Sequence, residues 1–578
     1  MIKRMNKATS LLIAAAAIVS IIPANAADYT KVDSQEGTVY SAVAYKDGKF
    51  FIDGEVDKKD EAAYYLANGK YNAISGIDTG SSIATYGTKY INVEDGDAFL
   101  NLETGAVTTD SVKENADDDT ASALRKNIKK DTDGRYTVAD AAAIKDLTGL
   151  ELPGKKFGQV WYGVQYAADK ATNAIATGGN LNVYTDATGN YIDADYNLGS
   201  VKVTTTATGA SGTVEKTVTV SNTDDSYNDA ASGTSVTASV SNQTVIGQDD
   251  NYIYRTAKVT IKAGTGVAVS KIDGISIAAG TTAFDTTVAG QVSFNAIQKI
   301  SKAQASDDVD GAKYAKTVNT YVVSDDAGVS ETLLASAKFN IVDGKVIAYT
   351  DGTSVDAQTI ELKSSQGYYY TDITEADAED AIATDVDANG NLWRLDGGYI
   401  YKFDNTDSWN KVYKVDGAMN KLSVYDQNNM VVWNEADEVY SVIGGKTTET
   451  PVDTTTPVQK GWVKTATGWT FYDAAGTQTK GKWVNDGGVW YMIKADGIMA
   501  TGWYNDNGTW YFLAGSGAMK TGWVQDGSTW YYLQSSGAMK TGWLNDNGTW
   551  YYLNGSGAML ANTIVDGYKL GASGAWVK

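Results

Sequence analysis

Paired tryptophans near the C-terminal end are the residues of this sequence whose type and spacing most clearly indicate chemistry. Eleven of the 15 tryptophans lie between Trp462 and Trp576. Ten of these form pairs with a spacing of seven, and the pairs recur every 20 or 21 residues: Trp462/Trp469, Trp483/Trp490, Trp503/Trp510, Trp523/Trp530 and Trp543/Trp550. An indole face is electron-rich, so several such rings around one space attract a quaternary ammonium group by cation–π interaction. Aromatic faces also stack on sugars.

The composition excludes most catalytic chemistry. The sequence has no Cys and no His, which removes thiolate nucleophiles, disulfides, the commonest general base and the commonest metal ligand. A glycosidase needs only two carboxylates, but no Asp or Glu stands in a context typical of a glycosidase. The acidic runs 114–120 and 374–381 are typical of solvated helix faces or loops. We therefore predict no catalytic residue.

One acidic segment has partial calcium-loop spacing. Asp131, Asp133, Gly134 and Asp140 match positions 3, 5, 6 and 12 of an EF-hand loop, but position 1 is Lys129, which cannot bind calcium. We predict an Asp-Gly turn between two helices there, and no metal or cofactor.

A β-hairpin is the element that positions each tryptophan pair. Trp523 and Trp530 are equidistant from Asp526-Gly527, a pair typical of type I′ turns. A two-residue turn at this position would place the two indoles directly opposite each other. Strand alternation then turns Tyr531 to the other face, toward an adjacent hairpin, where it completes a three-walled cage. The equivalent turn centres are Asp486-Gly487, Asp506-Asn507, Asp546-Asn547 and the less favourable Thr465-Ala466.

A fixed period of this length is typical of an array of stacked supersecondary units. From Gly461 to about Lys578 the units resemble the choline-binding, or cell-wall-binding, repeats (GW…WYYL…GxM) of Gram-positive surface proteins. The resemblance implies a β-hairpin solenoid that binds choline of teichoic or lipoteichoic acid between hairpins. Each site uses two Trp of one unit and a Tyr of the next, with a Met at the floor. The residues so assigned are Trp483, Trp490, Tyr511 and Met499; Trp503, Trp510, Tyr531 and Met519; and Trp523, Trp530, Tyr551 and Met539.

The outer units depart from the pattern. Trp462 and Trp469, with Tyr491, have a poorer turn, so their site is an open question. The last unit lacks the first Trp and is predicted to be a terminal cap. Because no WYY follows Trp543 and Trp550, we expect their pocket to bind poorly or not at all.

Two alternatives remain for the repeats. If the aromatic residues only held the solenoid together, Leu or Ile would serve equally well at the Trp positions. Related repeats in glucan-binding enzymes and clostridial toxins bind carbohydrate, and the double Trp in every complete copy favours choline over glucan.

The N-terminal residues indicate export. Lys3, Arg4 and Lys7 precede a short apolar run and the cleavage motif Ala24-Asn25-Ala26, which predicts a signal peptide over residues 1–26. No later segment is apolar over a length that predicts a transmembrane helix. The net charge of −22 argues against nucleic acid as a partner.

The chain is predicted to be multidomain and mainly β. We expect an α+β domain (27–160), a β-sandwich-like region rich in alternating Thr, Ser and Val (161–352) and a small β domain (353–445). In the last, two related segments place Trp393 and Trp433 forty residues apart, like blades of a propeller, but two copies are too few to close one. A Thr/Pro linker (446–459) precedes the repeat solenoid (460–578).

The sequence thus predicts a secreted surface protein held non-covalently at the cell wall, with a non-enzymatic ectodomain that binds an unidentified partner. The upstream region is also similar to clostridial surface proteins that carry these repeats. Our alternatives are a carboxylate-dependent wall glycosidase and a glucan-binding or other carbohydrate-binding repeat protein.

Overall fold

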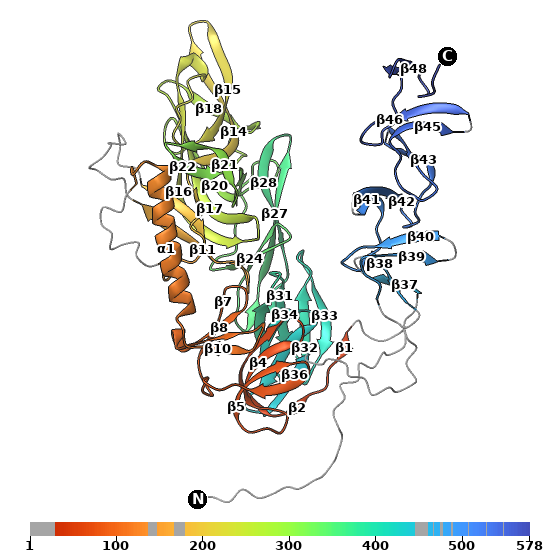
Figure 1. Ribbon diagram of the computed structural model, residues 1–578. Helices are drawn as coiled ribbons and strands as arrows, with labels where there is room; N and C mark the ends of the chain where they lie inside the picture. The colour runs from red at the N-terminus through yellow and green to blue at the C-terminus, as the bar shows by residue number, and fades with distance from the viewer. Residues whose placement is uncertain are drawn as a thin grey trace, which may run out of the picture. The chain divides into compact units, whose positions relative to one another are not determined.

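The computed structural model describes residues 29–136, 147–166, 180–444, 461–465, 468–473, 478–486, 489–506, 508–527, 529–546 and 548–577. The chain divides into two compact units, Met1–Thr448 and Glu449–Lys578. Both consist mainly of β-strands (Figure 1), which confirms the predicted fold class. The predicted signal peptide and the predicted linker lie outside the described residues.

Four small sheets of the upstream unit are built from strands near its two sequence ends, and two of these sheets combine strands from both ends. One contains β3 Thr38–Tyr45, β4 Lys49–Glu55, β5 Ala62–Ala67 and β6 Lys70–Ala73, and the next contains β7 Ile83–Tyr86, β8 Tyr90–Val93, β9 Ala98–Asn101 and β10 Ala106–Thr108. The third contains β1 Thr30–Lys31, β30 Ala383–Val386, β31 Leu392–Asp396, β32 Tyr399–Phe403 and β33 Trp409–Lys414. The fourth contains β2 Gln35–Glu36, β34 Lys421–Asp426, β35 Asn429–Asn434 and β36 Val439–Ile443.

The first strands of the described residues therefore complete sheets that are built mostly from residues 383–443. Strand β1 pairs with β33 in parallel, and β2 pairs with β36 in antiparallel orientation. Phe50 packs in one core with Val431 and Trp433. The three upstream segments that we predicted separately thus share sheets and cores. The two Trp-containing segments around residues 393 and 433 lie in separate sheets, and the strands within each segment pair in antiparallel orientation.

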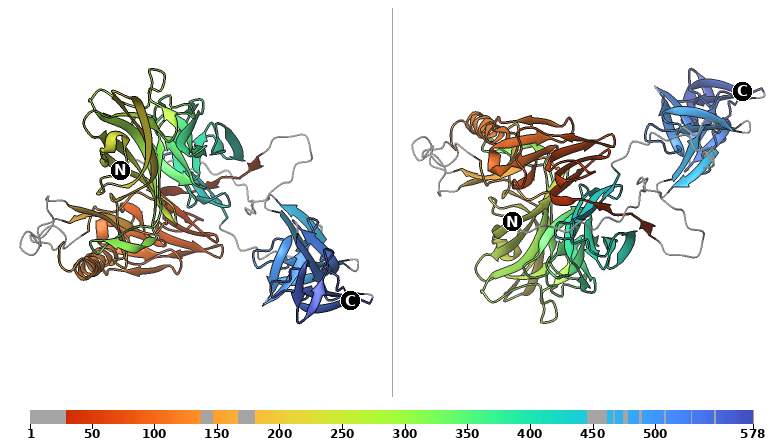
Figure 2. Two further views of the ribbon diagram at one scale, coloured as in Figure 1. Left: turned by 90° about the horizontal axis from the view of Figure 1, so that it is seen from above. Right: turned by 90° about the horizontal axis from the view of Figure 1, so that it is seen from below.

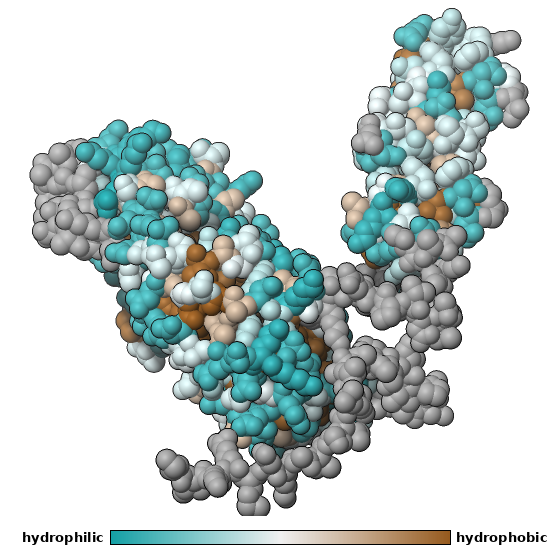
Figure 3. All heavy atoms as spheres, turned by 60° about the horizontal axis from the view of Figure 1, so that its bottom comes forward, coloured by the Kyte–Doolittle hydropathy of each residue, from teal (hydrophilic) through white to brown (hydrophobic). Residues whose placement is uncertain are grey.

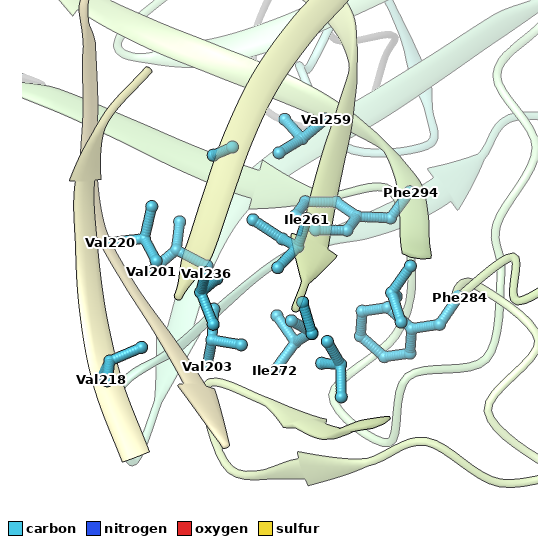
Figure 4. Packing of buried hydrophobic residues seen from close by; sticks show 14 of the residues in the cluster. Val201, Val203, Val218, Val220, Val236, Val259, Ile261, Ile272, Phe284 and Phe294 are labelled. Atoms are coloured by element: carbon cyan, nitrogen blue, oxygen red, sulfur yellow. The ribbon is translucent and has the colours of Figure 1, made fainter. Parts of the chain in front are cut away.

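A β-sandwich occupies the middle of the upstream unit. One sheet contains β14 Asn197–Gly209, β15 Gly212–Asn222, β18 Ala268–Ile272 and β19 Ile275–Ser276. The facing strands begin an eight-stranded sheet: β16 Val236–Gln248, β17 Tyr252–Ala263, β20 Gln291–Ser301, β23 Val318–Val322, β28 Tyr368–Glu375, β27 Ala357–Ser365, β25 Lys345–Tyr349 and β24 Lys338–Val342. Alternate residues such as Val203, Val220 and Ile261 meet in the core between the sheets (Figure 4).

The single α-helix of the described residues, α1 Val112–Asp131, lies on the outside of the upstream unit (Figure 2). Leu124 and Ile128 project at helical spacing onto the sheet that contains β11 Trp161–Tyr166 and β12 Leu181–Asp186. The remaining elements are β13 Tyr191–Asp193, β21 Gln304–Val309, β22 Ala312–Ala315, β26 Ser354–Val355, β29 Glu379–Asp380 and the 3-10 turns Glu94–Gly96 and Ala231–Gly233. The predicted Asp-Gly turn follows α1, with positive φ at Asp133 and Gly134. The second predicted helix falls largely on residues 137–146, outside the described residues.

A buried carboxyl group in the sandwich makes stability depend on pH. Asp273 is 7% exposed, and its carboxylate accepts a hydrogen bond of 2.6 Å from the Lys202 amide. Burial raises the pKa of Asp273 to about 6. The folded state therefore binds this proton more tightly than the unfolded state, and the free energy of unfolding falls as pH rises from about 4 to about 6.

We expect Asp273→Asn to stabilise the protein at pH 7 by about 2 kcal/mol and to have little effect at pH 4. The amide oxygen of Asn still accepts the Lys202 hydrogen bond, while the cost of burying a charge disappears. Urea unfolding at the two pH values measures the difference. Equal stabilisation by the substitution at both pH values would show that the titration of Asp273 does not cause the stabilisation.

Neither a helix that could cross a membrane nor a metal-binding cluster of side chains is present among the described residues. Of the helices in these ranges, none is long and apolar enough to cross a membrane. No group of three or more Asp, Glu, His or Cys side chains in the same ranges is arranged to hold a metal ion.

The C-terminal unit is a series of two-stranded antiparallel hairpins (Figure 1). Their strands are β37 Gly461–Thr465 and β38 Gly468–Tyr472; β39 Lys482–Asp486 and β40 Val489–Ile493; β41 Gly502–Asp506 and β42 Thr509–Leu513; β43 Gly522–Asp526 and β44 Thr529–Leu533; β45 Gly542–Asp546 and β46 Thr549–Leu553; and β47 Thr563–Val565 and β48 Tyr568–Leu570. An isolated hairpin is marginally stable in water, so these must support one another by stacking.

Candidate functional site

The two tryptophans of a pair are not directly opposite each other, because the turn lies one residue later than predicted and every cross-strand partner is therefore shifted by two residues. In the hairpin of β43 and β44, Trp523 pairs with Tyr532, and Trp530 pairs with Gln525. Asp526 pairs with Thr529, which leaves positions 527 and 528 to connect the strands. The other four Trp-bearing hairpins have the same offset.

Turn chemistry explains this register. In two hairpins the connecting positions, 507–508 and 547–548, hold Asn-Gly, the strongest signal for a two-residue turn. Gly508 and Gly548 have φ angles of +93° and +88°, which residues with a side chain rarely adopt. The prediction centred each turn midway between the tryptophans and so missed the Asn-Gly pair. In the first hairpin the connection is at 466–467, outside the described residues.

The tryptophans of a pair nevertheless touch on one face of the hairpin. Trp523 and Trp530 are diagonal neighbours, with ring centroids 6.4 Å apart and planes at 81°. The pairs Trp503/Trp510 and Trp543/Trp550 have the same separation of 6.4 Å. Directly across from the first Trp lies a third aromatic ring at 5.0 to 5.2 Å, which the sequence analysis did not assign: Phe512, Tyr532 or Tyr552.

A tyrosine of the next hairpin closes each set, as predicted. The ring centroids are 4.8 Å apart for Trp483 and Tyr511, 4.7 Å for Trp503 and Tyr531, and 4.8 Å for Trp523 and Tyr551. All three contacts are edge-to-face. Each predicted set thus takes its first Trp and its Tyr from neighbouring hairpins.

The second tryptophan of each pair is exposed to solvent. Its exposed fraction is 40 to 44% in all five copies: Trp469, Trp490, Trp510, Trp530 and Trp550. The first Trp is only half-buried. Large apolar side chains left exposed at the same position in five copies indicate a contact surface and not a core. Figure 3 shows the visible face of this unit mostly in white and teal, because Trp and Tyr have intermediate hydropathy.

Backbone hydrogen bonds join each methionine segment to the preceding hairpin. The amide N–H of Met519 donates to the carbonyl of Trp490, Met539 to Trp510, and Met559 to Trp530, each at 2.8 Å. Met519, Trp483 and Tyr511 pack against the same small core of Met492, Ala500 and Leu513. The methionine whose backbone bonds to each of these tryptophan pairs therefore belongs to the following unit.

Each methionine side chain then reaches on to a glycine of the next unit. A Cβ atom on Gly517 would lie 2.1 Å from the sulfur of Met499, and one on Gly537 would lie 2.2 Å from the sulfur of Met519. Met539 and Gly557 are related in the same way. Close stacking of the units therefore needs glycine at this position.

An aspartate of the next hairpin binds the indole N–H of the first tryptophan. The carboxylate of Asp526 accepts from Nε1 of Trp503 at 3.0 Å, and that of Asp546 accepts from Nε1 of Trp523 at 2.9 Å. The other three bonds are Trp462 to Asp486, Trp483 to Asp506 and Trp543 to Asp566, at 2.8 to 3.1 Å. The only polar atom of each such ring is therefore occupied.

The last tryptophan pair lines an open pocket that the sequence did not lead us to expect. A pocket of about 410 Å³ is lined by Trp543, Trp550, Tyr568 and Trp576. Tyr568 lies 5.4 Å from Trp543, and the Trp576 amide donates to the carbonyl of Trp550 at 2.8 Å. Tyr568 and Trp576 are eight residues apart, as are Tyr531 and Met539, and this spacing was the available signal.

The first pair has part of the same arrangement. Trp462 lies 4.7 Å from Tyr491, and the Met499 amide donates to the carbonyl of Trp469 at 2.7 Å. By this geometry Met499 stands beside the first pair, where the sequence analysis had placed it beside the second.

The fold and the site together define a repeat module with aromatic cages between stacked hairpins. Residues 520–563 match the family model described as choline-binding repeat, and 481–499 and 501–519 match the one described as putative cell wall binding repeat. Residues 481–563 are therefore choline-binding repeats. No curated protein matches the chain.

Three solved structures are similar to this chain. The choline binding domain of Spr1274 in Streptococcus pneumoniae is 49% identical over 14% of this chain and 96% of its own length, with a TM-score of 0.13. Choline binding protein F of Streptococcus pneumoniae, solved with a peptidoglycan analogue, is 24% identical over 45% of this chain and 96% of its own length, with a TM-score of 0.20. The pneumococcal cell wall endolysin from phage Cp-1, complexed with choline, is 36% identical over 24% of this chain and 42% of its own length, with a TM-score of 0.17.

Proposed function

We propose that the C-terminal unit binds choline of cell-wall polymers and so holds a secreted protein non-covalently at the bacterial surface. The recurrent exposure of the second tryptophan carries this proposal. If the rings served packing alone, the second Trp would be buried, or replaceable by Leu. Five copies that expose about two-fifths of an indole leave an aromatic wall free for a ligand.

The chemistry of the walls favours a quaternary ammonium over a sugar. The terminal pocket is lined by four aromatic side chains, and the indole N–H of Trp543 is already bonded to Asp566. A sugar needs convergent polar groups for its hydroxyls as well as a stacking face. A trimethylammonium group needs only electron-rich faces and no hydrogen bond.

We assign each pocket two Trp of one hairpin and a Tyr and a Met of the next. The terminal pocket supports this choice, since its fourth wall, Trp576, comes from the following unit. The pockets are Trp483, Trp490, Tyr511 and Met519; Trp503, Trp510, Tyr531 and Met539; and Trp523, Trp530, Tyr551 and Met559. Met499 then belongs with Trp462, Trp469 and Tyr491.

The terminal pocket is proposed as a further choline site. We expect Tyr568→Ala to lower the number of choline molecules bound per chain by one, because it removes the ring that closes this pocket against Trp543. Isothermal titration with choline counts the sites. Lys569→Ala, at the neighbouring exposed position, is the matched control and keeps the full number. An unchanged count in the Tyr568 variant would show that this pocket does not bind.

For the upstream unit we propose a binding or adhesive role, because a chain without His and Cys lacks the usual groups of wall amidases and peptidases. Incubation of the purified protein with cell walls tests this. The proposal predicts no release of reducing sugar. Release that is abolished by a single Asp or Glu substitution would identify a carboxylate-dependent glycosidase instead.

A further inference from the structure

Five aspartates stand at the edges of the aromatic cages. Each comes from one hairpin and binds the indole N–H of the preceding hairpin through its carboxylate: Asp486, Asp506, Asp526, Asp546 and Asp566. A hydrogen bond to an ionised carboxylate is stronger than one between neutral groups. These bonds therefore fix both the orientation and the charge environment of one wall in each cage.

In the terminal cap, the contact of the aspartate with the preceding cage can be distinguished from a role of the aspartate in its own hairpin. The cap has the shortened sequence Thr563–Leu570 and lacks both tryptophans. It keeps two residues that face the preceding repeat, Asp566 and Tyr568, and both contact Trp543. Because the cap has no Trp pair of its own, Asp566 and Tyr568 serve the cage of the preceding repeat.

Hairpin stability alone does not account for the aspartates. Asp526 of β43 and the Trp503 indole N–H of the preceding hairpin meet at an exposed site, as do two of the other four pairs, while the remaining two bonds are part-buried. Water would satisfy each of these groups, and a hydrogen bond exposed to water stabilises a fold only slightly.

The position of the carboxylate matters electrostatically. A cation bound over the Trp503 face lies within about 6 Å of the ring centroid. The carboxylate of Asp526 is 3.0 Å from Nε1 of the same ring. The two charges are then separated by roughly one Debye length or less at physiological salt, so their attraction is incompletely screened. The carboxylate also pulls the indole proton and so enriches the ring face in electrons.

From this geometry we propose that the cage-edge aspartates are specificity-determining residues, which make each aromatic cage select a cationic ligand over a neutral one of the same shape. The proposal rests on the proposed function and adds to it the group that favours the charge. Cage shape selects the three methyl groups, and the aspartate selects the positive charge at their centre.

The test replaces all five aspartates by asparagine in the full chain. Asparagine keeps an oxygen that accepts the indole hydrogen bond, so ring positions are preserved while the charge is lost. Affinity is measured for choline and for 3,3-dimethyl-1-butanol, its neutral carbon isostere. We expect choline binding per site to weaken about fivefold, with isostere binding unchanged. Asp496→Asn is the control, because that carboxylate bonds to Lys494 and not to an indole.

The outcomes are distinct. A selective loss of choline affinity supports the proposal. Equal weakening of both ligands would mean that the aspartates only hold the rings in place, and no change in either would mean that they are irrelevant; both results overturn the proposal while choline binding by the wild-type chain stands. If the wild-type chain bound the isostere as tightly as choline, the cages would not select the charge and the proposal would also be overturned. If the wild-type chain bound neither ligand, the proposed function would fail first.

Discussion

Alanine at the exposed tryptophans is expected to weaken choline binding roughly 100-fold or more while the repeat module stays folded. The variant carries Trp490→Ala, Trp510→Ala, Trp530→Ala and Trp550→Ala. Each substitution removes one wall of a cage, and several weakened sites together lose the gain that comes from multivalent attachment. The fold survives because the second Trp is exposed, whereas the first Trp and the Tyr of the next hairpin supply the contact between units.

Equilibrium titration with choline measures this loss, and near-ultraviolet circular dichroism reports on the remaining aromatic packing. Ile564→Ala is the control, since Ile564 is 67% exposed and lines no described pocket. Unchanged affinity in the four-Trp variant would show that ligand binds away from the paired indoles. A collapse of the circular dichroism signal would show that the second Trp is structural after all.

The second large effect is expected at a glycine between the repeats. Gly517 has a φ of +83°, and an added Cβ would lie 2.1 Å from the sulfur of Met499. Gly517→Ala therefore imposes a left-handed conformation on a residue with a side chain and drives Met499 out of its place. We expect the melting temperature of the repeat module to fall by roughly 10 °C, with weaker choline binding beside Met499.

Gly515 offers a matched control in the same loop. It does not have positive φ, and a Cβ there meets nothing within 4 Å. Gly515→Ala should leave the melting temperature nearly unchanged. Thermal unfolding of both variants, followed by tryptophan fluorescence, makes the comparison. Equal melting temperatures for the two would show that Met499 moves aside at no cost and that tight stacking at this glycine is dispensable.

The sequence was sufficient for the repeat architecture and for the contact between the first Trp of a pair and a Tyr of the next hairpin. A spacing of seven between tryptophans and a period of 20 depend only on local strand geometry, and Tyr531 turns to the neighbouring hairpin because side chains alternate along a strand. The register was missed because it depends on which two residues make the turn. The spacing of Trp523 and Trp530 is symmetric about Asp526-Gly527, which indicated that these two residues make the turn. Asn507-Gly508 in another hairpin indicated instead a turn one residue later.

The site residues that only the structure identified could not be found from the spacing of residues within one repeat. Asp526 and Trp503 are 23 residues apart, and their bond follows only once consecutive hairpins are stacked. Tyr568 and Trp576 were overlooked because the cap does not contain WYY. In the upstream unit, the pairing of Gln35 with Tyr440 is a contact of such long range that no local pattern indicates it.

Retention on an immobilised choline matrix tests the central claim most directly. The account predicts that the full chain binds the matrix, resists washing with glucose polymers, and elutes with free choline at millimolar concentration. Elution by glucose polymers but not by choline would contradict it and would identify the aromatic cages as carbohydrate sites.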